Sequence, residues 1–113
     1  MHELGIMYNI VERVLEVVKN NELTEVEAIV LTVGEQSGVV PQYLHSCYPA
    51  AIDGTMLEST LLEVEVIAAD AICGNCGETF AVVENDGICP QCDCDEFELI
   101  SGGEFTLKEI RAR

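Results

Sequence analysis

The sequence predicts an α+β protein: a small domain of two helices and a three-stranded sheet, interrupted by an inserted zinc-ribbon domain of the rubredoxin-like knuckle type. Two observations predict this class. Helical and strand-like hydrophobic patterns alternate up to residue 67, and two Cys-x-x-Cys pairs then precede one last strand-like segment. The cysteine segment is therefore expected between two strands of one sheet. We expect residues 1–68 and 101–113 to form the first domain and residues 69–100 the zinc ribbon.

The first expected helix starts almost at residue 1 and stops near Asn20-Asn21. Its apolar residues recur at helical spacing, with charged residues on the other side. They are Leu4, Met7, Tyr8, Val11, Val14, Leu15 and Val18. A largely buried strand is expected at 26–33, because this run is rich in Val, Ile and Leu and ends at Gly34.

Pro41 suits the first position of a second helix, which Gly54 should stop. Pro49 should kink this helix, because it removes the hydrogen bond to the carbonyl of His45. The expected apolar side is Leu44, Cys47, Tyr48, Ala51 and Ile52. A second strand is predicted at 61–67, and a last strand from about 105 to 111 after a turn at 101–103.

The strongest motif is the set of four cysteines Cys73, Cys76, Cys89 and Cys92. Each Cys-x-x-Cys pair can direct two sulfurs toward one point, and four thiolates are the ligand set that tetrahedral Zn(II) prefers. The knuckle spacing, together with the lack of a secretory signal pattern, favours a metal over two disulfides. A rubredoxin-like iron site would use the same ligands, so iron stays open.

The charge balance restricts the partners. There are 21 acidic and 5 basic residues, giving a formal net charge of -16. Zinc ribbons that bind nucleic acid do so with basic faces, so nucleic acid is not expected as a partner. No apolar stretch is long enough to span a membrane, and no signal pattern occurs, which predicts a cytoplasmic protein without membrane association.

The N-terminal Met1-His2-Glu3 offers a second metal motif. The free amine, the amide nitrogen of His2 and its imidazole can close two chelate rings in one plane. This geometry suits Ni(II) or Cu(II) better than tetrahedral zinc. A histidine at the second position is common by chance, so the motif alone does not establish a site.

Together these segments resemble the HypA/HybF nickel metallochaperones of hydrogenase maturation. The resemblance covers essentially the whole chain. The segments that carry it are Met1-His2-Glu3-Leu4, Gly34-Glu35 with Ser37-Gly38-Val39-Val40-Pro41, Gly54-Thr55 with Glu58, the two cysteine pairs, and Ile100-Ser101-Gly102. It implies a nickel-binding α/β domain and a structural zinc domain. It also implies work with the HypB GTPase to load nickel into the large subunit of [NiFe]-hydrogenase and, in some organisms, into urease.

Carried over to this sequence, the resemblance assigns Met1, His2 and Glu3 to nickel and the four cysteines to zinc. The remaining nickel ligand stays open among the Glu3 carboxylate, His45, another acidic side chain and a residue of the acceptor. We expect His45 to be exposed and Cys47 to be a small buried residue.

One departure from the family pattern follows the second cysteine pair. Asp93 stands where the family usually has a glycine in a tight turn, and Cys94 comes next. Cys94 is therefore an alternative to Cys92 as the fourth zinc ligand.

No catalytic constellation is apparent: neither histidine lies in a His-Glu-x-x-His motif, and no glycine-rich loop precedes a Lys-Ser/Thr pair. The sequence therefore predicts a nickel carrier that is not an enzyme. The alternatives are a rubredoxin-like electron-transfer module and a zinc-ribbon adaptor that only binds proteins.

Overall fold

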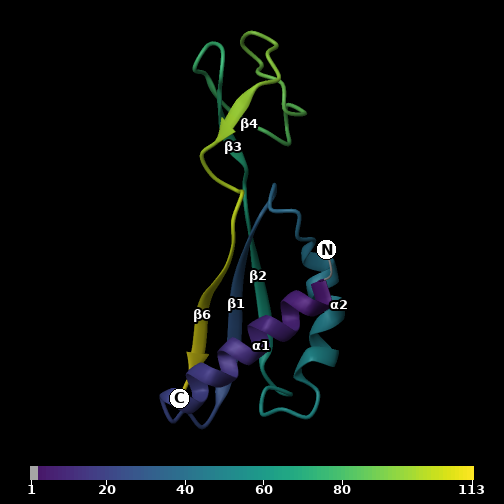
Figure 1. Ribbon diagram of the computed structural model, residues 1–113, viewed down its shortest axis with the longest axis vertical. Coiled ribbons are helices and arrows are strands. Elements are labelled where there is room, and N and C mark those ends of the chain that lie inside the picture. Colours follow the sequence, from purple (N-terminus) through teal and green to yellow (C-terminus); the bar gives the residue numbers. More distant parts are fainter. Residues whose placement is uncertain (1–2) are drawn as a thin grey trace. The chain divides into compact units, whose positions relative to one another are not determined.

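The computed structural model describes residues 3–113, and it has the α+β architecture that the sequence predicts (Figure 1). The three longer strands form one sheet in the order β2-β1-β6, and the three short strands form a second in the order β4-β3-β5. The elements are α1 (Glu3–Asn20), β1 (Val26–Gly34), α2 (Pro41–Ile52), β2 (Leu61–Ile67), β3 (Asp70–Cys73), β4 (Thr79–Ala81), β5 (Phe97–Leu99) and β6 (Phe105–Ala112).

The chain divides into two compact units. The first comprises residues 1–32, 40–65 and 106–113, and the second comprises residues 33–39 and 66–105. Both helices belong to the first unit, and the three short strands with all four paired cysteines belong to the second. No helix in the described part of the chain, residues 3–113, is long and apolar enough to cross a membrane.

The core of the first unit forms between α1, α2 and β1. In Figure 1, α1 lies across the sheet, and it packs against α2. The buried side of α1 consists of Met7, Ile10, Val11, Val14 and Val18, all at helical spacing. Leu4 and Tyr8, which the sequence placed on this side, are exposed instead. The helix ends at Asn20, and Glu22 then takes a left-handed conformation (φ 52°) that reverses the chain.

The second helix runs from Pro41 through Pro49 to Ile52. Gly54 follows with a φ of 76°, which explains the predicted stop, because this conformation favours glycine. The Tyr48 hydroxyl donates to the Thr60 carbonyl at 2.9 Å, and the Thr60 hydroxyl donates to the Val26 carbonyl at 2.8 Å. These buried bonds join the end of α2 to the starts of β2 and β1.

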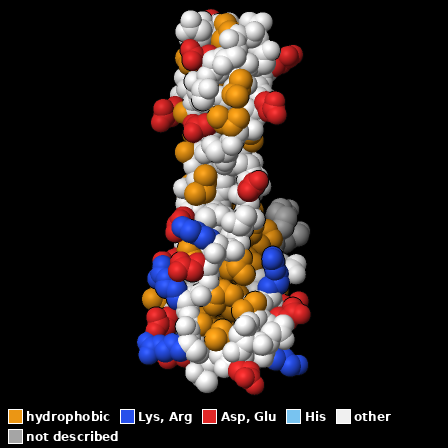
Figure 2. All heavy atoms as spheres, turned by 90° about the vertical axis from the view of Figure 1, so that its left-hand side faces the viewer, with side chains coloured by type: hydrophobic (Ala, Val, Ile, Leu, Met, Phe, Trp, Pro, Cys, Tyr) orange, Lys and Arg blue, Asp and Glu red, His pale blue; other side chains and the backbone are white. Residues whose placement is uncertain are grey.

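The central strand β1 is almost fully buried, whereas its neighbours β2 and β6 consist of half-buried and exposed residues. On the exposed side, basic residues of β6 pair with acidic residues of β2. Lys108 bonds Glu65 at 2.9 Å and Arg111 bonds Glu63 at 2.8 Å, so both pairs span β1. Arg113 pairs with Glu27 of β1. Figure 2 shows basic and acidic side chains interspersed along this unit.

In the second unit, β3 pairs antiparallel with both β4 and β5. Ala71 of β3 lies opposite Phe80 and Leu99, and Cys73 lies opposite Phe97. These strands are only three or four residues long. Their register determines which side chains surround the cysteines.

Candidate metal centre

The first cysteine pair forms a tight knuckle. The amide of Gly77 donates to the Cys73 carbonyl at 3.1 Å, and the Cys73 amide donates to the Glu78 carbonyl at 2.8 Å. The amides of Asn75 and Cys76 point at the Cys73 sulfur, at 3.4 and 3.5 Å. Gly77 takes a φ of 77°. The turn therefore directs two amide donors at the Cys73 sulfur. It also brings the sulfur of Cys76 to the same side of the turn as that of Cys73.

The second pair repeats the two backbone bonds of this knuckle and one of its two amide-to-sulfur contacts. The Asp93 amide donates to the Cys89 carbonyl at 2.9 Å, and the Cys89 amide donates to the Cys94 carbonyl at 2.9 Å. The Gln91 amide lies 3.4 Å from the Cys89 sulfur. Asp93 takes a φ of 63° at the place that Gly77 occupies in the first knuckle. The predicted left-handed turn is thus present, with aspartate in the glycine position.

The two knuckles bring the four sulfurs of Cys73, Cys76, Cys89 and Cys92 within 4.8 Å of one another. The Sγ atoms of Cys73 and Cys92 are 3.6 Å apart, and those of Cys76 and Cys89 are also 3.6 Å apart. Four thiolates around tetrahedral zinc, each about 2.3 Å from the metal, lie about 3.8 Å from one another. The donor set therefore fits zinc in both chemistry and spacing. All six cysteines are free thiols, so the two-disulfide alternative does not describe this structure.

The electrostatics of the cluster favour a bound cation. Hydrogen bonds from the Cys76 and Asn75 amides lower the pKa of Cys73 to about 6. The Glu78 amide acts to lower the pKa of Cys76, but desolvation and the adjacent cysteine sulfurs outweigh it and raise that pKa to about 12. Four sulfurs this close can all be thiolates only when a cation compensates their charge.

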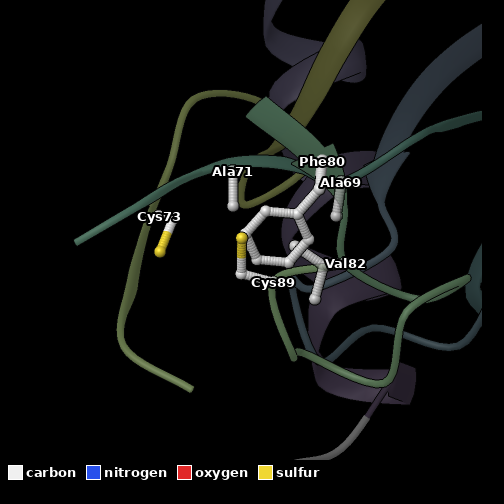
Figure 3. Close-up of a cluster of buried hydrophobic side chains, with 6 residues drawn as sticks. All are labelled: Ala69, Ala71, Cys73, Phe80, Val82 and Cys89. Atoms are coloured by element: carbon white, nitrogen blue, oxygen red, sulfur yellow. The ribbon is translucent and has the colours of Figure 1, made fainter. Parts of the chain in front are cut away.

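A small apolar core supports the sulfurs. Figure 3 shows the Phe80 ring surrounded by Ala69, Ala71, Val82 and Cys89. Phe97 packs against this cluster and meets Phe80 edge to face, with ring centroids 5.9 Å apart. The small alanines leave room for the ring beside the sulfurs. This core is slight, so cross-linking by metal would add substantially to the stability of the unit.

Cys94 has a backbone role in the second knuckle, and its sulfur lies outside the four-sulfur cluster. Its carbonyl closes the second knuckle, and its sulfur lies 3.5 Å from the Glu96 amide. Cys94 thus occupies the position that Glu78 holds in the first knuckle, where the carbonyl accepts the hydrogen bond from the first cysteine amide. The four-sulfur cluster contains Cys92 and does not contain Cys94.

The N-terminal motif is described only in part. Met1 and His2 lie outside the described residues. The Glu3 carboxylate lies 3.5 Å from the amide of Val40, the N-cap residue of α2, which has no side-chain cap of its own. A carboxylate there interacts favourably with the positive end of the helix dipole. Sequence reasoning missed this capping contact, because Glu3 and Val40 are far apart in the chain.

The other candidate residues lie on α2. His45 is exposed, as predicted. Cys47 is only half-buried, so the expectation of a buried thiol was wrong. Cys47 lies on the flank of the apolar side formed by Leu44, Tyr48 and Ala51, where the helix surface begins to meet solvent.

The fold and the four-sulfur cluster place this protein among α+β proteins that carry a knuckle-type metal module. Comparison with known families is more specific: residues 1–112 match the family described as "Hydrogenase/urease nickel incorporation, metallochaperone, hypA". The chain belongs to the HypA family, as the resemblance implied, and so to a family of metallochaperones.

Curated relatives agree with this assignment. The chain is 36% identical over 110 residues to the hydrogenase maturation factor HypA of Rhizobium leguminosarum bv. viciae, covering 97% of each chain. It is also 36% identical to the HypA of Chlorobium limicola, covering 97% of this chain and 95% of that one. The solution structure of the Ni metallochaperone HypA from Helicobacter pylori matches 99% of this chain and 97% of its own, with a TM-score of 0.67. At 19% identity, that likeness concerns the fold.

Proposed function

We propose that this protein is a nickel carrier that binds Ni(II) at its N-terminus and delivers it to an immature nickel enzyme. The family match over residues 1–112 carries this proposal, since it spans both the N-terminal motif and the cysteine knuckles. Nickel is the cargo. The protein itself performs no catalytic step, in keeping with a family of metallochaperones.

For the cysteine cluster we propose structural Zn(II) held by Cys73, Cys76, Cys89 and Cys92. The support is the sulfur spacing and the repeated amide-to-sulfur bonds, which suit four thiolates. Bound zinc would neutralise part of the negative charge of these thiolates and would cross-link the two knuckles. We propose residues 69–100 as the zinc-ribbon domain and residues 1–68 with 101–113 as the nickel domain.

For nickel we propose the amine and amide nitrogens of Met1 and His2, the His2 imidazole, and the Glu3 carboxylate as candidate ligands. The contact between Glu3 and the Val40 amide is long, at 3.5 Å, so exchanging it for a metal bond costs little. A weakly held ligand suits a carrier, because transfer to an acceptor proceeds by ligand exchange.

The proposed partners are a HypB-type GTPase and the large subunit of [NiFe]-hydrogenase, with urease maturation as a second destination, and the proposed location is the cytoplasm. High negative charge would assist encounter with basic protein surfaces. Nucleic acid is a poor partner, because three of the five basic residues, Lys108, Arg111 and Arg113, are engaged in ion pairs with glutamates.

Nickel titration of protein with an untagged N-terminus tests the proposal. His2→Ala should abolish tight nickel binding and leave one zinc per chain, and so should one residue inserted before Met1, because it moves the amine away from His2. Affinity should fall steeply on acidification, since an amine of pKa about 8 and an imidazole of pKa about 6.5 must lose protons. His45→Ala separates the candidates for the remaining ligand: normal nickel binding in this variant would exclude His45, and weakened binding would assign it to the site.

Two results would contradict the proposal. Undiminished stoichiometric nickel binding in the protein with an inserted residue would show that the amine is not a ligand. Visible absorption of an iron tetrathiolate, together with iron in metal analysis of protein made with both metals available, would favour an electron-transfer module instead. Restoration of hydrogenase activity in a cell that lacks its own HypA would test delivery directly.

A further inference from the structure

The second unit contains a pocket that the metal centre does not use. It is an open depression of about 360 Å³, lined by Gln36, Val82, Val83, Asp86, Gly87 and Phe97. This volume is at the small end of the roughly 300–1,000 Å³ of typical ligand sites. Its size suits a single side chain better than a large cofactor.

The loop between β4 and the second knuckle shapes the pocket. The Gly87 amide donates to the Val82 carbonyl at 2.9 Å, and the Asn85 side-chain amide donates to the Ala81 carbonyl at 2.8 Å. Asp86 and Gly87 both take left-handed conformations, with φ values of 52° and 73°. The loop is therefore held by its own backbone bonds.

The walls combine apolar surface with one negative charge. Val82 is buried and Val83 is 50% exposed, and both line the pocket. A β-carbon added to Gly87 would lie 3.5 Å from Cε2 of Phe97, so the glycine leaves the edge of this ring uncovered. Asp86 is the charged residue of the lining, and Gln36 is its uncharged polar residue.

The surroundings of the pocket are acidic throughout. Residues 33–39 and 66–105 contain ten acidic residues and no lysine or arginine. Figure 2 shows red side chains and no blue ones on the visible face of the upper part, where this unit lies. No cation of the unit itself competes for Asp86, so a cationic group from outside is the complementary ligand.

We propose that this pocket receives an arginine side chain presented by a partner protein. The methylene stem would lie along Val82 and Val83, where apolar contact stabilises it. The planar guanidinium would donate to the Asp86 carboxylate and the Gln36 amide oxygen beside the Phe97 ring. Lysine fits less well, because its compact ammonium neither pairs bidentately nor stacks. The inference concerns a site separate from both metal motifs.

The test uses the full zinc-loaded chain and nuclear magnetic resonance titration. The probes are N-acetyl-arginine amide, its uncharged citrulline analogue, and the peptide acetyl-Gly-Leu-Arg-Leu-Gly-amide. We expect arginine amide to shift the amides of residues 82–88 and 97 saturably, with a dissociation constant in the millimolar range. The citrulline analogue should bind about three- to tenfold more weakly. The peptide should bind more tightly than the amide.

Asp86→Asn should weaken arginine binding about three- to tenfold, and it should fold, because asparagine readily adopts a left-handed conformation. Glu84→Gln is the matched control: it removes the same charge from the same loop outside the pocket lining, and should leave affinity within about twofold. Equal binding of citrulline and arginine, or equal loss in both variants, would overturn the proposal. So would a peptide that binds no better than the amide, since the site would then serve a small cation.

Discussion

Gly34 and Gly102 meet backbone to backbone: a β-carbon on Gly34 would lie 2.1 Å from the carbonyl oxygen of Gly102. That same carbonyl accepts the Gln36 amide at 2.8 Å. Gly102 is itself left-handed, with a φ of 82°, and a β-carbon there would lie 2.4 Å from Cα of Ala69. Three backbone segments thus pass one another at distances that only glycine permits.

This contact makes the glycines sensitive to the smallest substitution. Gly34→Ala and Gly102→Ala should each lower the free energy of unfolding by about 2 kcal/mol or more, from overpacking and, at Gly102, from left-handed strain. Urea denaturation of the zinc-loaded protein measures the effect. Gly5→Ala is the control, because nothing lies within 4 Å of its added carbon and alanine favours helix, so it should stabilise by up to about 1 kcal/mol. A neutral Gly34→Ala would refute the close approach.

Removing a cluster thiol should release the metal. Cys89→Ala is expected to lose the zinc and to collapse the amide dispersion of residues 66–105, because the apolar core there is too small to fold alone. Cys94→Ser should keep one zinc per chain, since the Cys94 sulfur lies outside the cluster. Metal analysis and amide spectra of the two variants check this. Zinc retained in Cys92→Ala but lost in Cys94→Ser would mean that Cys94 is the fourth ligand.

The left-handed turn at Asp93 predicts a graded response to substitution. Asp93→Gly should change stability by no more than about 1 kcal/mol and in the stabilising direction, because glycine adopts this φ without strain. Asp93→Val should cost about 1–3 kcal/mol, because a β-branched side chain is strained there. The chelator concentration at which half of the zinc is released measures the effect of each substitution. Asp95→Val serves as the control, since Asp95 is exposed and has no positive φ, and an equal loss there would show that charge alone matters.

Burial of Tyr48 makes stability depend on alkaline pH. Desolvation raises the pKa of this phenol to about 12 from 10.0. Between these values the unfolded chain loses the proton while the folded chain keeps it, so the contribution present below pH 10 is lost as pH rises toward 12. Tyr48→Phe should flatten this part of the pH profile and cost about 1 kcal/mol at neutral pH for the lost bond to Thr60.

Unfolding curves at several pH values, with ultraviolet titration of the tyrosines, measure this dependence. Tyr43→Phe is the matched control, because Tyr43 is 54% exposed and should leave the alkaline profile unchanged. An identical pH profile in the wild-type protein and Tyr48→Phe would contradict the role of burial.

The features that the sequence predicted share a local cause. The periodicity around Met7 and Val14 and the Val-rich run at 26–33 define elements from neighbouring residues alone, and the cysteine spacing defines the cluster in the same way. The features it missed depend on distant partners. The cap of α2 by Glu3, the contact between Gly34 and Gly102, and the pocket at Asp86 each join segments that no local pattern connects.

The order β2-β1-β6 ties completion of the larger sheet to the cysteine unit. β6 pairs with β1, but in the chain it is separated from β2 by the three short strands and the four clustered cysteines. Residues 66–105 therefore form the loop that must close before the third strand can join the sheet. Because a compact loop brings its ends together at a smaller entropic cost than a disordered one, order in the cysteine unit favours closure of the sheet in the other unit.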